Sequence, residues 1–158
     1  MENLLLQPIT INQMEVKNRI YMPAMHLAMC EDFKITDQIV QFYARRAKGG
    51  AGLICVGYAT IDDMSGNSQN IGAHKDEYLE GLAALAKGIK ENGAKAAIQL
   101  NHSGRYNFSF FMDGRQPVAP SPIASKFTRE MPRELTVEDI NKIVTSFTLY
   151  SIQSTFLL

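Results

Sequence analysis

The sequence lacks a net charge, because 16 lysine and arginine residues balance 16 aspartate and glutamate residues. Nucleic acids and anionic membrane surfaces attract proteins with an excess of basic residues, so neither is expected as a partner. The sequence also lacks an apolar run of membrane-spanning length, and its first residues, MENLLLQPIT, do not form a signal peptide. A cytoplasmic protein is therefore expected.

Cysteine is scarce as well. Cys30 and Cys55 are far apart in the sequence and have no partners at metal-ligand spacing. Two unpaired thiols in a reducing compartment are the simplest interpretation, and neither a disulfide framework nor a metal site is predicted. What is present is the composition of one ordinary globular domain, with 46% apolar and 20% charged residues in 158.

Strands and helices are predicted to alternate along the chain. Apolar and polar residues alternate over 9–20 around Asn12-Gln13, which predicts a short hairpin, and the strand that follows should end near Pro23. Apolar patterns then predict a helix from Thr36 to the Gly49-Gly50 pair and a strand over 51–59. A helix over about 76–92 and a strand over 94–100 are predicted to follow. A third helix is predicted to begin at Thr136 and Asp139, which resemble a capping box.

Two polar segments are predicted as loops, 62–74 and 102–135. The second is long enough to indicate a functional loop. It contains the aromatic residues Tyr106, Phe108, Phe110 and Phe111, which either line an acyl or enone pocket or pack the loop itself. His74, at the end of the first loop, is expected to face solvent.

The order of strands and helices predicts a parallel sheet with right-handed crossovers. An open doubly wound sheet and part of a (β/α)-barrel both fit this order. The stretch after the first strand, MPAMHLAMCEDFKIT, has no glycine fingerprint for a dinucleotide. The barrel is therefore favoured over the open nucleotide-binding sheet.

Small and polar residues gather where the three predicted strands end, which is where chemistry gathers in a parallel α/β fold. The strand ends carry, in order, Pro23, Ala24, Met25 and His26; Gly57 and Tyr58; and Gln99, His102 and Arg105. Small residues let a flat ligand approach the backbone, and the amide of Gln99 can both donate to and accept from an imide-like edge. The set suits a planar heteroaromatic ring better than a phosphate or a metal.

Five stretches carry a family resemblance: LLLQPITINQMEVKNRIYMPAM, FYARRAKGGAGLICVGYATI, IQLNHSGRY, PVAPSPI and RELTVEDINKIVTSF. In this order and spacing, from Leu4 to Phe147, the chain resembles the old yellow enzyme family of FMN-dependent ene reductases and NADH:flavin oxidoreductases. The MH after Ala24 and the HSGRY ending are most similar to the 2,4-dienoyl-CoA reductase branch.

The resemblance implies the N-terminal portion of a (β/α)8 TIM barrel, truncated after about three strand–helix units and preceded by a short β-hairpin. It implies an oxidoreductase that binds FMN at the carboxyl ends of the strands, with NAD(P)H as reductant and a small-molecule enone or enoyl substrate. By position, Pro23, Ala24 and Met25 would lie along the isoalloxazine ring, Gly57 and Tyr58 at its edge and Gln99 against its pyrimidine portion.

Three further residues take their expected roles from the same resemblance. His26 stands where many members have Thr or Cys near a flavin carbonyl and is counted with the cofactor-binding residues. His102 and Arg105 are expected to brace the loop and neighbouring carbonyls rather than to touch the substrate.

The resemblance defines a partial FMN-binding barrel domain over residues 1–147. Residues 148–158, TLYSIQSTFLL, are interpreted as an atypical tail left by a truncation or frameshift. In the family, the proton-donating or substrate-orienting pair, an arginine beside the flavin and the phosphate-binding loops come after later strands, so the active site is expected to be incomplete.

A sheet of three strands leaves unpaired edges and uncovered helix faces, which favour self-association.

Three functions stay open. The first is an FMN-dependent oxidoreductase fragment, and the second is a non-catalytic half-barrel remnant that is unstable or depends on a partner. The third is a small open α/β binding module of another class.

Overall fold

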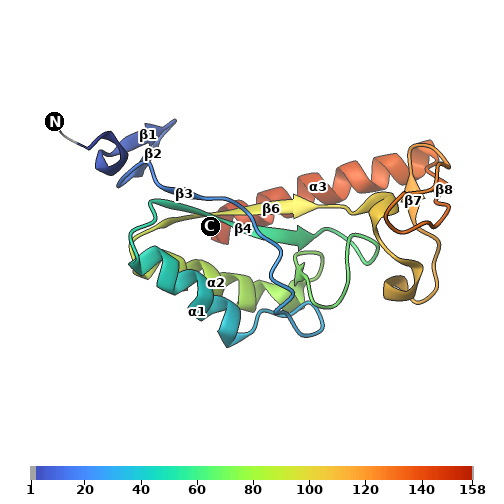
Figure 1. The fold of residues 1–158 in the computed structure, drawn as a ribbon, viewed down its shortest axis with the longest axis horizontal. Coiled ribbons are helices and arrows are strands. Elements are labelled where there is room, and N and C mark those ends of the chain that lie inside the picture. The colour runs from blue at the N-terminus through green and yellow to red at the C-terminus, as the bar shows by residue number, and fades with distance from the viewer. Residues whose placement is uncertain (1–2, 158) are drawn as a thin grey trace.

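Three parallel strands form the centre of the molecule (Figure 1). The structure is a computed structural model that describes residues 3–157, with side chains described through Ser151. Strand β4 (Leu53–Thr60) lies between β3 (Tyr21–Met22) on one side and β6 (Lys95–Asn101) on the other, and both pairings are parallel. The predicted parallel sheet is confirmed, and because the strands are parallel their carboxyl ends lie at one edge.

An antiparallel hairpin precedes this sheet, as predicted. Its strands are β1 (Ile9–Ile11) and β2 (Met14–Val16), paired from Ile9 with Val16 to Ile11 with Met14. Asn12 in the turn has a φ of 52°, in the left-handed region that asparagine tolerates better than most residues. The strand after the hairpin ends at Met22, directly before Pro23, which has no N–H to continue a ladder.

The three predicted helices are present: α1 (Asp37–Lys48), α2 (Leu79–Glu91) and α3 (Val137–Leu157). Thr36 caps α1, since its hydroxyl accepts from the backbone N–H of Ile39 at 3.4 Å. At the start of α3, the hydroxyl of Thr136 accepts from the backbone N–H of Asp139 at 3.1 Å, and the carboxylate of Asp139 accepts from the backbone N–H of Thr136 at 2.9 Å. This is the capping box expected from the sequence.

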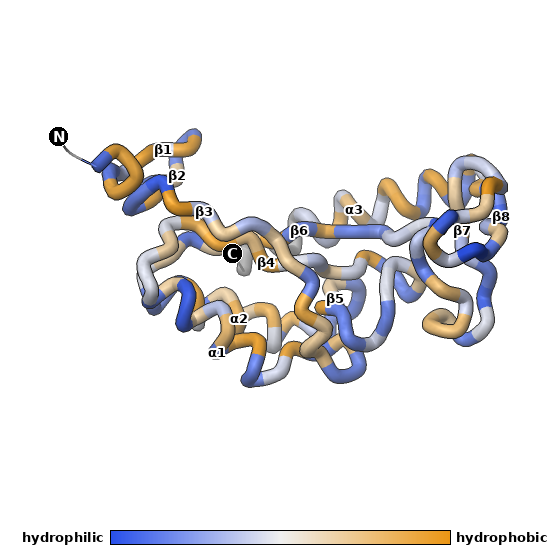
Figure 2. Tube along the Cα trace, in the orientation of Figure 1, coloured by the Kyte–Doolittle hydropathy of each residue, from blue (hydrophilic) through white to orange (hydrophobic). Residues whose placement is uncertain are grey.

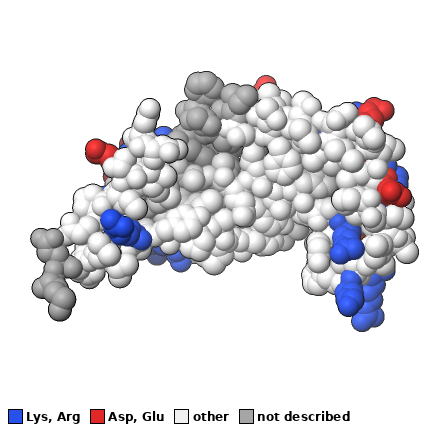
Figure 3. Space-filling model, turned by 90° about the horizontal axis from the view of Figure 1, so that it is seen from above, with Lys and Arg blue, Asp and Glu red and all other residues white. Residues whose placement is uncertain are grey.

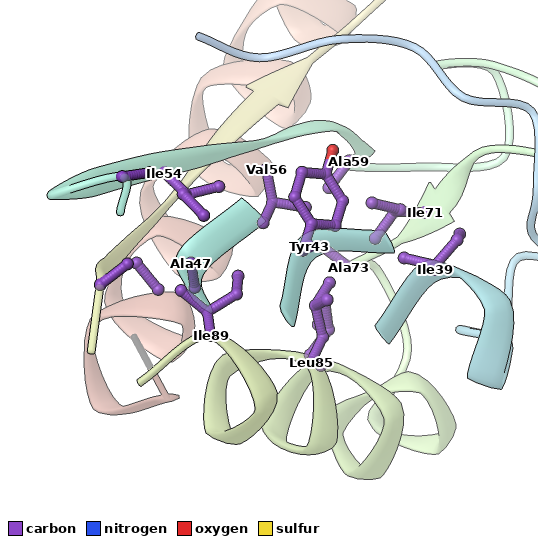
Figure 4. Packing of buried hydrophobic residues seen from close by; sticks show 14 of the residues in the cluster. Ile39, Tyr43, Ala47, Ile54, Val56, Ala59, Ile71, Ala73, Leu85 and Ile89 are labelled. Atoms are coloured by element: carbon purple, nitrogen blue, oxygen red, sulfur yellow. The ribbon is translucent and has the colours of Figure 1, made fainter. Parts of the chain in front are cut away.

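The hydrophobic core lies between the sheet and helices α1 and α2, which pack side by side on one face (Figure 1, Figure 4). Ile54 and Val56 of β4 point into it and are at most 1% exposed. The helices contribute one stripe each: Ile39, Tyr43 and Ala47 from α1, and Leu82, Leu85, Ala86 and Ile89 from α2. Burial of these side chains supplies the main stabilisation of the fold.

The opposite face of the sheet is uncovered among the described residues. Side chains alternate across a strand, so Cys55 and Gly57 point away from Ile54 and Val56. On this side lies Tyr21, which is the register partner of Leu53 and is 52% exposed. In a closed barrel this face would point inward, so its exposure fits a barrel segment rather than an open doubly wound sheet with helices on both faces.

Both predicted loops contain ordered segments that the sequence did not indicate. Strand β5 (Ile71–Gly72), within 62–74, extends the sheet by pairing with the end of β4. Strands β7 (Val118–Ala119) and β8 (Arg133–Glu134) pair in parallel within 102–135, which also holds two 3₁₀ turns, Gly104–Tyr106 and Ser109–Met112. Pairings of two residues leave no apolar periodicity to detect.

His74 is buried, so the expectation that it faces solvent is wrong. It is 9% exposed, its Nδ1 lies 3.0 Å from the hydroxyl of Thr60 and its Nε2 lies 3.1 Å from Asp63. The rings of Phe33 and Tyr78 cover it, each with its centroid 5.2 Å away. The short strand β5 carries the chain back against β4 immediately before His74, and this places the imidazole inside.

Helix α3 runs alongside β6 and continues past residue 147 without a break (Figure 1). Tyr150 donates a hydrogen bond to the carbonyl of His74 at 3.0 Å and packs against the core. Other apolar residues of α3 are exposed, among them Val137 (75%) and Val144 (57%). The domain boundary expected at 147 stays a prediction, and the side chains of 152–158 lie outside the described part.

Polarity is distributed unevenly over the surface. Hydrophobic residues recur along α1 and α2, whereas the end of β6 is hydrophilic (Figure 2). On the face seen from above, described charged side chains gather toward the two ends and leave a broad uncharged centre (Figure 3). Among the described residues, no helix combines the length and the hydropathy that spanning a membrane requires.

The two cysteines test which face of the sheet is open. Cys30 is 4% exposed and burial raises the pKa of its thiol to about 12, whereas Cys55 is partly exposed on the uncovered face. The thiolate fraction of Cys30 is therefore roughly a thousand-fold below that of an ordinary thiol. We expect a maleimide to label one cysteine in the native protein and both in denaturant.

Substitution assigns the labelled thiol. Cys55→Ser should abolish native labelling and Cys30→Ser should leave it unchanged. Labelling of Cys30 at the rate of Cys55 in the folded protein would contradict the packing described above.

Candidate functional site

The three strand ends meet at Gly57. Gly57 and Gln99 are register partners across β4 and β6. A Cβ built on Gly57 would lie 2.7 Å from the Cβ of Ala24 and 3.2 Å from the Cβ of Gln99. The absence of a side chain at position 57 is what lets the segments after β3 and along β6 approach each other. The structure thus brings Ala24, Gly57 and Gln99 together, as the parallel topology predicted.

We call this place the platform: Ala24, Gly57 and Gln99, which approach one another, together with Pro23 and Met25, the chain neighbours of Ala24. Gln99 is exposed, but it points to the same side of the sheet as Gly57. Its exposure arises because this face is uncovered among the described residues. Gln99 is therefore available to a ligand on the platform.

The platform has the shape and donor set for a planar ring. Its centre is a glycine and an alanine, so nothing projects there beyond a methyl group. Met25 offers a polarizable thioether at its side and Gln99 offers an amide that both donates and accepts. A flavin ring has a flat apolar face and an imide edge, and the residues present fit it. No group of three His, Cys, Asp or Glu side chains among the described residues is arranged to hold a metal ion.

His26 and Tyr58 lie next to each other beside the platform. Their ring centroids are 5.1 Å apart. Both contact Asn70, whose Nδ2 lies 2.6 Å from Nε2 of His26 and whose Oδ1 accepts from the hydroxyl of Tyr58 at 3.4 Å. Asn70 was not predicted from the sequence, because nothing in a polar loop shows that one asparagine turns inward to meet a residue 44 positions earlier.

His102 and Arg105 contact the backbone of their own region. Nδ1 of His102 accepts from the N–H of Gly104 at 3.1 Å, and the guanidinium of Arg105 donates to the carbonyl of Ile123 at 3.3 Å. A carboxylate that the sequence did not suggest, Asp62, lies 3.5 Å from Nε2 of His102.

The aromatic residues of the long loop pack on one another. The ring of Phe108 lies 5.3 Å from Phe110, 6.0 Å from Phe111 and 5.4 Å from Phe127, between centroids. Phe110 and Phe127 nevertheless stay about two-thirds exposed, at 68% and 67%. The contacts fit loop packing, and the pocket hypothesis for this cluster stays a prediction.

A parallel sheet with helices on one face and an uncovered opposite face is the arrangement of a segment of a (β/α)-barrel. The comparison with known proteins names the family. The chain belongs to the NADH:flavin oxidoreductase / NADH oxidase family, whose profile matches residues 4–152. The family expected from the sequence is confirmed, and the match extends beyond Phe147.

Similar sequences come from several bacterial oxidoreductases. The chain is 43% identical over 145 residues to a metal reductase of Desulforamulus reducens, covering 92% of this chain and 22% of the relative. It is 34% identical over 140 residues to an NADH oxidase of Thermoanaerobacter brockii, covering 87% and 22%. It is 38% identical over 151 residues to an NADPH dehydrogenase of a Geobacillus species, covering 93% and 43%. The chain thus spans less than half the length of these relatives.

Solved structures share the fold. A 2-naphthoyl-CoA reductase in complex with 2-naphthoyl-CoA superposes with a TM-score of 0.91 at 25% identity, over 98% of this chain and 26% of that one. Morphinone reductase in complex with tetrahydroNAD gives a TM-score of 0.91 at 22% identity, over 99% and 47%. Old yellow enzymes are among the similar structures, so the predicted barrel segment is confirmed.

Substitution of Gly57 tests the close approach of the strand ends. Because a Cβ there would lie 2.7 Å from that of Ala24, Gly57→Ala should destabilise the protein by about 1–3 kcal/mol in urea unfolding. The double variant Ala24→Gly/Gly57→Ala removes the closer of the two clashes and should recover part of the loss. Unchanged stability of Gly57→Ala would show that the strand ends do not converge as described.

Proposed function

We propose that the platform binds the isoalloxazine ring of FMN and that the chain contributes this site to an FMN-dependent oxidoreductase. Bound FMN would supply hydride transfer from NAD(P)H to the activated double bond of an enone or enoyl substrate. The observation that carries the proposal is the meeting of Ala24, Gly57 and Gln99 at the strand ends, where Gln99 is exposed, Ala24 is half-buried and Gly57 is buried between them. Family membership and the similar FMN-family folds support it.

The residues of the chain have distinct roles in this proposal. Gln99 orients the ring, because its amide can pair with an edge that carries both a donor and an acceptor. Pro23, Ala24 and Met25 support one face of the ring, and Gly57 keeps the centre flat. Tyr58 and His26 border the ring, with His26 as the residue that offers a ring nitrogen to it.

The substrate class is supported by related proteins. One structurally similar reductase is solved with 2-naphthoyl-CoA and another with tetrahydroNAD, and both are small molecules. A small-molecule enone or enoyl thioester is therefore proposed for the complete barrel. Two free cysteines and a balanced charge support a reducing, cytoplasmic location.

The chain itself is proposed to hold the ring but not the phosphate. In (β/α)8 barrels a phosphate is usually bound by loops after strands seven and eight, and the described residues supply three strands of the barrel. Catalysis would then need groups beyond those described, and a non-catalytic, partner-dependent half-barrel is the alternative. The uncovered sheet face and the exposed residues of α3 favour that alternative.

Flavin titration tests the proposal. Folded protein should quench flavin fluorescence at tens of micromolar, and riboflavin should bind within about three-fold of FMN because the contacts are to the ring. Gln99→Leu should weaken binding about ten-fold, the cost of an amide's hydrogen bonds. Gln41→Leu, on the exposed side of α1, is the matched control and should bind as wild type.

Two outcomes would overturn the cofactor proposal for this chain. One is the absence of binding by protein that circular dichroism shows to be folded. The other is equal loss of affinity in the Gln99 and Gln41 variants, which would mean that the platform amide makes no specific contact.

Self-association is proposed through the uncovered face and the apolar side of α3. Analytical ultracentrifugation should show oligomers whose population rises with concentration. Val144→Lys places a charge on this side and should shift the distribution toward monomer, whereas Thr145→Lys, one position along, should do so much less. A monomer at all concentrations, unaffected by either substitution, would contradict the interface.

A further inference from the structure

We propose that Asn70 is a positioning residue that holds the imidazole of His26 in its Nδ1–H tautomer. The ring nitrogen that carries the proton would then be the one offered to the ligand, as a hydrogen-bond donor. The tautomer follows from the chain's own contacts. Only the identity of the ligand rests on the function proposed above.

The orientation of the Asn70 amide is fixed by a neighbour that can only donate. The backbone N–H of Asn67 lies 2.7 Å from one atom of the Asn70 side chain, and a backbone nitrogen cannot accept a hydrogen bond. That atom must therefore be the oxygen, Oδ1. The hydroxyl of Tyr58 donates to the same oxygen at 3.4 Å. The amide cannot be flipped without losing the bond to Asn67.

The NH₂ group of Asn70 consequently faces His26. Its Nδ2 lies 2.6 Å from Nε2 of the imidazole. An amide nitrogen donates and does not accept, so Nε2 must present its lone pair. In a neutral imidazole the proton then resides on Nδ1. Neutral histidine in water favours the Nε2–H form, so the opposite tautomer needs a cause, and Asn70 provides one.

The residues around Asn70 hold it in place. Its side chain is buried, at 1% exposure, and a Cβ on Gly66 would collide with its oxygen, so the glycine makes room for it. The loop that carries Asn70 is tied to the segment after His26. The N–H of Cys30 donates to the carbonyl of Gln69 at 3.2 Å and the N–H of Phe33 to that of Ser68 at 2.7 Å. The donor thus meets His26 with little freedom to move.

Asn70 and His26 differ in burial, and this difference lets a buried residue control an exposed one. Asn70 is buried and every polar atom of its amide is engaged, whereas His26 is exposed beside the platform. An imidazole with Nδ1–H donates to a carbonyl oxygen of a ligand, whereas the other tautomer would present a lone pair at Nδ1 and repel it. Asn70 would therefore select ligands that offer an acceptor at this position.

The tautomer can be measured without any flavin. The full chain is labelled with ¹⁵N-histidine, and long-range ¹H–¹⁵N correlation identifies the protonated ring nitrogen at a pH above the imidazole titration range. His26→Gln assigns the signals among the three histidines. We expect wild-type His26 as Nδ1–H. Asn70→Asp, whose carboxylate only accepts, should switch it to Nε2–H, and Gln69→Ala should leave it unchanged.

The outcomes separate this inference from the flavin proposal. Wild-type His26 as Nε2–H, or any tautomer state of His26 that Asn70→Asp does not alter, overturns the role of Asn70. An Nδ1–H tautomer that switches in Asn70→Asp, with wild-type signals that shift on addition of riboflavin, supports both proposals. An Nδ1–H tautomer that switches in Asn70→Asp but does not respond to riboflavin supports the positioning role and counts against the flavin site.

Discussion

The site depends on one constraint, the absence of a side chain at position 57. Parallel strands bring their carboxyl ends to one edge, but how closely they approach is set by what fills the space between them. Gly57 leaves room for the methyl group of Ala24 on one side and the side chain of Gln99 on the other. The result is a flat centre with an amide at its border, and the proposed ring site follows from that geometry.

The two faces of the sheet serve different purposes. Ile54 and Val56 hold β4 against α1 and α2, and their burial stabilises the sheet that positions Gly57. The alternate residues of the same strand are left for a ligand or for the rest of a barrel. One strand thus supplies both the stability and the proposed binding surface, and a one-residue change of register would exchange its two faces.

The sequence alone predicted the elements with strong periodicity and the convergence of the strand ends, because both follow from local pattern and parallel topology. It did not predict β5, β7 or β8, whose two-residue pairings are too short to leave a pattern. The burial of His74 and the contact of Asn70 with His26 were also missed. Both depend on where a polar loop folds back against distant strands, which no local pattern records.

The central claim is that a flavin lies on the platform formed by Ala24, Gly57 and Gln99. Amide chemical-shift mapping of the ¹⁵N-labelled chain with FMN tests it most directly. We expect the perturbed signals to cluster at the carboxyl ends of β3, β4 and β6. Perturbations confined to the opposite end of the sheet, near Lys17 and Gly93, or to the outer faces of α1 and α2, would contradict it.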